Sequence, residues 1–164
     1  MIIVGFDPGL ATLGFGVIRK ENKKKPEVID YGIISTPKDE NLAVRLVMLE
    51  KGIKQIIETY KPDEIAVEEL FFAKNVKTGI AVAHARGVIL LTATKECGKL
   101  FEYTPLQIKQ ALTGYGRADK NQIQQMVKTM LSLKSIPRPD DAADALAVAL
   151  CHSQTNKLGG LFSI

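Results

Sequence analysis

The chain has 164 residues, the size of one domain with room for a hydrophobic core. Hydrophobic residues make up 46% and charged residues 24%, a balance that argues against disorder. No apolar run approaches the roughly 20 residues of a membrane span, and we expect no signal peptide before the first strand. The net charge of +4 and the pI near 9.0 favour an anionic partner.

The cysteine count bears on the cellular compartment. Cys97 and Cys151 are the two cysteines, and they lack the CxxC spacing of a metal or redox site. The two histidines, His84 and His152, are too few and too scattered for a zinc site. A reducing, cytoplasmic location is therefore expected.

The first third of the chain predicts three strands joined by short connections. Residues 2–7 form a continuous apolar run that Pro8-Gly9 ends. A second strand at residues 14–19 follows at hairpin distance, and a lysine-rich turn precedes a third strand at residues 28–35. Connections this short imply antiparallel neighbours.

The remainder alternates between helical and strand patterns. Leucines and isoleucines at helical spacing predict a helix that begins at Leu42 and ends near Tyr60. The other predicted elements are a strand at 64–68, a helix at 80–97, a strand at 100–103, one or two helical turns at 106–113, a helix through 123–131 and a last helix at 140–153.

This order of elements predicts an α/β domain with a mixed five-stranded sheet flanked by helices. We expect the domain to span residues 1–155 and residues 156–164 to form a flexible tail. The pattern alone leaves the strand order open. The right-handed crossover rule places the fourth strand beside the first.

Four acidic residues stand out because of where they fall in these elements. Asp7 closes the first strand and Glu68 closes the fourth, so both lie where ligands bind in such sheets. Asp141 and Asp144 lie three residues apart, on one face of the alanine-rich last helix.

Two neighbouring acids leave the choice open at this stage. Glu69 adjoins Glu68, and only one of them faces a given side of the sheet. Asp140 could replace Asp141, although an acid at a helix N-terminus is also explained by capping and by the helix dipole.

Carboxylates gathered at strand ends repel one another unless a positive charge lies between them. A hard divalent cation with oxygen ligands is the simplest such charge. Four carboxylates suit two Mg²⁺ ions per active site, the arrangement of metal-dependent phosphoryl chemistry.

Aromatic and basic residues near the acids suggest a nucleic-acid surface. Phe71 and Phe72 follow the fourth strand, and one of them could stack on an unpaired base while the other joins the core. Lys74 and Lys77 flank them and could bind phosphates. A second basic group precedes the last helix and contains Lys109, Arg117, Lys120 and Lys128.

Four motifs in this order resemble the RuvC family of bacterial Holliday junction resolvases. They are Gly-Phe-Asp-Pro-Gly at residues 5–9, Ala-Val-Glu-Glu-Leu-Phe-Phe-Ala-Lys-Asn at 66–75, His-Ala-Arg-Gly-Val at 84–88 and Asp-Asp-Ala-Ala-Asp-Ala-Leu-Ala at 140–147. The resemblance covers nearly the whole chain and ends near residue 155.

The resemblance implies a ribonuclease H-like fold and a homodimer that uses Mg²⁺ or Mn²⁺ to nick two like strands of four-way junction DNA symmetrically. It implies cooperation with the RuvA–RuvB branch migration complex. It selects Asp7, Glu68, Asp141 and Asp144 as the catalytic, metal-binding acids. It also assigns base stacking to Phe71 and DNA contacts near the site to Lys109 and Lys120.

Two other functions stay open on the sequence. One is a ribonuclease H-like nuclease that acts on RNA or on RNA–DNA hybrids, which a panel of substrates would distinguish. The other is a binding module without catalysis, which a metal-dependent nick in any substrate would exclude.

Overall fold

A five-stranded mixed sheet forms the centre of the structure, a computed structural model that describes residues 1–69, 75–155 and 164. Its strands are β1 (Ile2–Asp7), β2 (Thr12–Arg19), β3 (Glu27–Ser35), β4 (Glu64–Glu68) and β5 (Leu100–Tyr103), in the order β3-β2-β1-β4-β5. The first three strands are antiparallel neighbours, whereas β4 is parallel to β1 and β5 is parallel to β4. The predicted fold class and the placement of the fourth strand beside the first are confirmed.

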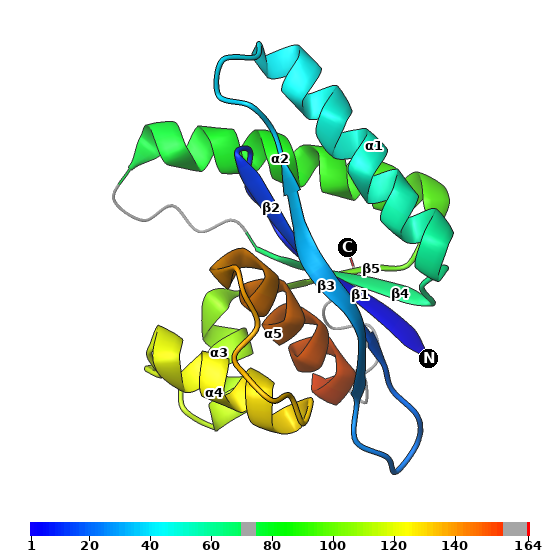
Figure 1. Cartoon of the computed structure of the whole chain (residues 1–164), viewed down its shortest axis with the longest axis vertical. Helices are drawn as coiled ribbons and strands as arrows, with labels where there is room; N and C mark the ends of the chain where they lie inside the picture. The colour runs from blue at the N-terminus through cyan, green and yellow to red at the C-terminus, as the bar shows by residue number, and fades with distance from the viewer. Residues whose placement is uncertain (70–74, 156–163) are drawn as a thin grey trace.

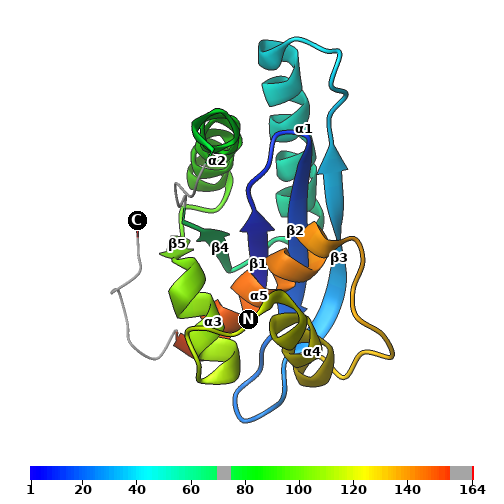
Figure 2. The ribbon, with the colours of Figure 1, turned by 90° about the vertical axis from the view of Figure 1, so that its left-hand side faces the viewer.

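Helices cover both faces of the sheet (Figures 1 and 2). One layer contains α1 (Leu42–Tyr60) and α2 (Val76–Glu96), and the other contains α3 (Pro105–Thr113), α4 (Lys120–Met130) and α5 (Asp140–Thr155). Alternation along β1 separates the two cores, because Val4 and Phe6 pack with the α1–α2 layer while Ile3 packs with the α5 layer.

The element boundaries differ from the sequence prediction where caps and pairing decide them. The second strand begins at Thr12, because Thr12 pairs with Ser35 of β3. The second helix begins at Val76, four residues earlier than predicted, since the side chain of Asn75 accepts hydrogen bonds from the first turn. The last helix continues to Thr155.

The predicted helical turns at 106–113 form a complete helix, α3. Its N-terminus is closed by a capping box in which Thr104 and Gln107 bond each other's backbone N–H groups. The predictions for Phe71, Phe72 and Lys74, and for the tail at 156–163, lie outside the described residues.

Helix α5 lies directly against the backbone of β1 and β2. A Cβ atom at Gly5 would lie 2.3 Å from the carbonyl oxygen of Ala145, and one at Gly14 would lie 2.0 Å from that of Asp141. These distances are far below van der Waals contact, so only glycine allows this approach. The contact places the first turn of α5 beside the end of β1, because Gly14 pairs with Asp7 across the sheet.

Helix α2 has an apolar exposed side. Among the described residues it is the one helix long and apolar enough to cross a membrane by length and composition, a feature that the sequence analysis did not anticipate. Its other side is built into the fold, with Ala85, Ile89 and Ala93 buried in the core that contains β1 and β4. The exposed side therefore calls for a partner, which we consider below.

We expect Gly14→Ala to lower the free energy of unfolding by about 1–3 kcal/mol, the usual cost of overpacking an interior. Urea unfolding measures this loss. Gly32→Ala is a matched control, because its Cβ would meet only the half-buried ring of Phe15, at 3.0 Å, and this ring can move. Equal losses in the two variants would contradict the close approach of α5 to the sheet.

Candidate active site

Strand alternation brings Asp7 and Glu68 to the face of the sheet that α5 covers. Ala66 packs in the same cluster as α5, and Glu68 lies two residues beyond it on the same face. Phe6 and Val67 are register partners in neighbouring parallel strands, so the next residues, Asp7 and Glu68, end side by side. Alternation directs Glu69 to the opposite face.

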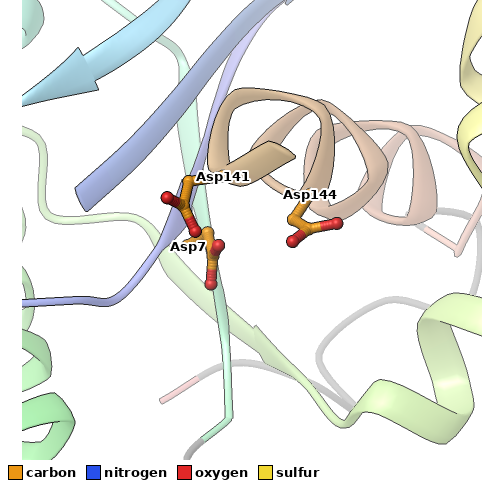
Figure 3. Close-up of side chains that lie close together, drawn as sticks. All are labelled: Asp7, Asp141 and Asp144. Atoms are coloured by element: carbon orange, nitrogen blue, oxygen red, sulfur yellow. The ribbon is translucent and has the colours of Figure 1, made fainter. Parts of the chain in front are cut away.

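The first turn of α5 supplies the other two carboxylates. Asp141 and Asp144 project towards Asp7 at the end of β1 (Figure 3). One carboxylate oxygen from each of these three residues lies within 4.8 Å of the others. Glu68 reaches the same group through a hydrogen bond between its carboxyl group and that of Asp7.

Asp140 belongs to a separate polar cluster, although it adjoins Asp141. Its carboxylate accepts a hydrogen bond from Gln124 at 3.2 Å, pairs with Lys120 at 3.1 Å and also pairs with Arg138. The hydrogen bond from Lys120 lowers the pKa of Asp140. The structure thus brings Asp141, rather than Asp140, to Asp7.

Burial and mutual repulsion make Asp7, Glu68 and Asp144 reluctant to ionise. Burial, followed by the charges of Glu68, Asp144 and Asp141, raises the pKa of Asp7 to about 9. Burial also raises the pKa of Glu68 and of Asp144, and Lys120 opposes the rise at Asp144. Asp7 can then donate its proton to Glu68, so a proton holds these two carboxyl groups together.

This donor set fits a hard divalent cation. All of its side-chain ligand atoms are carboxylate oxygens, which Mg²⁺ and Mn²⁺ prefer. The raised pKa values show that burial and neighbouring like charges disfavour ionisation of these carboxyl groups, and a cation among them would offset that cost.

An open cleft of about 230 Å³ adjoins the acids. It is lined by Glu68 and Asp144 together with Lys109 of α3 and Lys120 of α4. The charge of Lys109 lowers the pKa of Glu68, against the larger effect of burial, and Lys120 lies 3.8 Å from Asp144. The cleft therefore joins anionic and cationic groups, as a phosphodiester site requires.

The other predicted DNA-binding residues within the described part of the chain do not line this cleft. Lys77 is exposed in the first turn of α2, and Arg117 is exposed in the connection between α3 and α4. The sequence analysis did not single out Gln124 or Arg138, which hold Asp140. Gln124 gave no signal because its burial in α4 depends on tertiary packing.

We expect Asp7→Asn to stabilise the metal-free protein at pH 8 by on the order of 1–2 kcal/mol. The raised pKa of Asp7 means that its contribution to stability is complete below about pH 4 and is lost as the pH rises towards 9. At pH 5 less of this contribution has been lost, so the stability gained with asparagine, which cannot ionise, should be smaller than at pH 8. Thermal unfolding in EDTA at both pH values measures it.

Asp140→Asn is the matched control, because the carboxylate of Asp140 is paired with cations and its pKa is lowered. It should give no gain at either pH. If Asp7→Asn were no more stable than the unmodified protein at pH 8, the electrostatic account of the site would be wrong.

Comparison with known proteins places this geometry in a family. The family described as "Crossover junction endodeoxyribonuclease RuvC" matches residues 3–152. The protein of that name from Clostridioides difficile is 55% identical over 158 residues, which cover 96% of this chain and 93% of the relative. The one from Alkaliphilus oremlandii is 54% identical and covers 100% of this chain and 99% of the relative.

A solved structure gives the same answer. "T. thermophilus RuvC in complex with Holliday junction substrate" superposes with a TM-score of 0.93 at 32% sequence identity, covering 100% of this chain and 99% of the other. Family match, sequence identity and fold agree over the whole length, and the chain belongs to the RuvC family of crossover junction endodeoxyribonucleases.

Proposed function

We propose that this protein is an endodeoxyribonuclease that resolves Holliday junctions in DNA recombination and repair. The observation that carries the proposal is the convergence of three carboxylates, those of Asp7, Asp141 and Asp144, with Glu68 hydrogen-bonded to Asp7. The adjoining cleft is also lined by Lys109 and Lys120. The relatives that share the family are named for this activity, and the superposed RuvC structure contains a Holliday junction substrate.

Asp7, Glu68, Asp141 and Asp144 would hold the cofactor, Mg²⁺ or Mn²⁺, with two ions per active site. When bound, such ions activate water and stabilise the leaving 3′ oxygen in phosphodiester hydrolysis. Asp7 and Glu68 release their shared proton as the cofactor binds. Asp141 and Asp144 would bind the cofactor from the side of α5, and the contact of α5 with the sheet holds them in place.

The lysines of the cleft act on the DNA phosphate. Lys109, beside Glu68, is placed to stabilise the negative charge that develops on the phosphate in the transition state. Lys120 is fixed by Asp140 at 3.1 Å, so its ammonium group stays at the mouth of the cleft. Lys74, Lys77 and Arg117 are proposed to contact phosphates farther along the strand. Phe71 is proposed to stack on a junction base, with Phe72 as the alternative.

A homodimer fits both the substrate and the structure. A four-way junction has approximate two-fold symmetry, so two sites related by a dyad can nick two like strands symmetrically. The exposed apolar side of α2 is the proposed contact. Val76, Ile80 and Leu91 are 71%, 51% and 56% exposed at helical spacing, and open space surrounds Gly87 between them. Gly87 would let two helices approach closely.

The same family membership supports two further proposals. The protein is proposed to cooperate with the RuvA–RuvB branch migration complex, which would deliver junctions to it. It is proposed to act in the cytoplasm.

The test of the function is cleavage of a synthetic mobile four-way junction with Mg²⁺, with the nicks mapped on all four strands. We expect paired nicks in two like strands and none in linear duplex or in an RNA–DNA hybrid. Asp7→Asn should abolish nicking and leave junction binding within about twofold, because binding comes mainly from phosphate contacts. Asp140→Asn should still cut. Cutting of the hybrid in preference to the junction would overturn the proposal.

For the dimer, we expect Ile80→Glu combined with Leu91→Glu to give a monomer by light scattering, since two buried charges at an interface are costly. Leu106→Glu is the control, because Leu106 is 54% exposed on α3, away from α2. It should leave the mass unchanged. A dimeric double variant would assign the contact to another surface.

A further inference from the structure

A buried chain of hydrogen-bonded side chains lies under the second half of α5, outside the candidate active site. His152 is fully buried, and its Nδ1 lies 2.6 Å from the hydroxyl oxygen of Tyr103. Its Nε2 lies 2.7 Å from a carboxylate oxygen of Glu64. The hydroxyl of Thr155 donates to that of Tyr103 at 3.0 Å. The proposed mechanism uses none of these groups.

One assignment of protons satisfies the chain. The carboxylate of Glu64 accepts a hydrogen bond, so Nε2 of His152 carries the proton and Nδ1 accepts from the hydroxyl of Tyr103. Burial lowers the pKa of His152, against an opposing effect of Glu64. The ring also packs on Phe101, with 4.4 Å between ring centroids. The imidazole is thus fixed by two directional bonds and one ring contact.

The chain joins α5 and β4, two of the elements that carry the acids, to the neighbouring strand β5. His152 belongs to α5, which carries Asp141 and Asp144, and Glu64 belongs to β4, which ends at Glu68. Tyr103 is the register partner of Glu68 on β5.

The distances along the two elements match. Asp144 and His152 are eight residues apart in α5, about 12 Å at the rise of a helix. Glu64 and Glu68 are four residues apart on one face of β4, about 13 Å at the rise of a strand. Helix α5 therefore meets β4 at two points, at the acids and at His152.

The end of α5 near the acids is held against the sheet by the glycine contact, and Asp140 there pairs with Lys120 of α4 and with Arg138. The carboxylates there repel one another, and neither of these contacts links the helix to β4. The hydrogen bond between His152 and Glu64 supplies a directional link to β4.

We propose that His152 is a positioning residue that fixes the register of α5 along β4, through Glu64 and Tyr103, and thereby sets the separation between Asp144 and Glu68. The inference rests on the proposed function, in which these acids share a cofactor. A shift of α5 by a fraction of a helical turn would move Asp144 away from Glu68 while leaving the core folded.

The experiment compares His152→Leu and Tyr103→Phe with the control Tyr60→Phe. The control also removes one inter-element hydroxyl bond, from Tyr60 of α1 to Asp30 of β3, away from α5. The first readout is the apparent Mg²⁺ dissociation constant of the DNA-free protein, taken from the rise of Tm with Mg²⁺. We expect it to weaken at least about fivefold in both test variants and less than about twofold in the control.

The second readout is the cleavage rate at saturating junction, which should fall by roughly 10- to 100-fold in the test variants, as expected for misplaced reacting groups. Junction binding in EDTA should stay within about twofold. Glu64→Gln keeps an oxygen that can accept from Nε2 and should retain most of the Mg²⁺ affinity, whereas Glu64→Leu should lose it. If His152 and Tyr103 only stabilised the fold, the Mg²⁺ dissociation constant and the cleavage rate would change in proportion to the loss of Tm, in Tyr60→Phe as in the test variants.

Test variants that bind Mg²⁺ and cleave like the control would overturn the inference. If His152→Leu does not fold, Tyr103→Phe and the Glu64 pair decide the outcome by the same criteria. If the unmodified protein binds Mg²⁺ but cuts no junction, the proposed function fails, and weakened Mg²⁺ binding in the variants would still support the positioning role.

Discussion

The backbone contact between α5 and the glycines of β1 and β2 is the constraint on which the rest of the structure depends. Gly5 and Gly14 bring carbonyl groups of α5 closer to the sheet than any side chain would allow. The alanines of α5 are buried, and Ala147 and Ala149 lie in the same cluster as Ile3 and Ala66. This packing places two carboxylates of a helix beside two at strand ends, which neither element could arrange alone.

That arrangement has an electrostatic cost that the fold must offset elsewhere. The pKa of Asp7 is raised to about 9, and those of Glu68 and Asp144 are also raised, so the site resists full ionisation without a cation. The apolar packing of α5 opposes the repulsion, and its ten buried residues begin directly after Asp141. The same helix therefore carries destabilising carboxylates at its start and stabilising buried residues along the rest of its length. This division is common in active sites, where function costs stability.

Periodicity and turn residues were enough to predict the fold and the strand ends at Asp7 and Glu68. The crossover rule then placed β4 beside β1, because handedness limits the choices. Pattern alone could not choose between Asp140 and Asp141, since the difference depends on Lys120 and Gln124, which are distant in sequence and, with the nearby Arg138, hold Asp140 aside. The packing role of Gly5 was equally hidden, because glycine in a strand has several explanations.

The two proposed tasks, association of two subunits and cleavage of DNA, use opposite faces of the sheet. Along β4, Val67 packs with the α1–α2 layer, and the next residue, Glu68, faces α5 and the cleft. A partner subunit on the exposed side of α2 would therefore leave the cleft with Lys109 and Lys120 open to DNA. The same strand links the two tasks, because the core beneath α2 positions the strand that ends in Glu68. Association through α2 would stiffen β4 from one face while α5 holds it from the other.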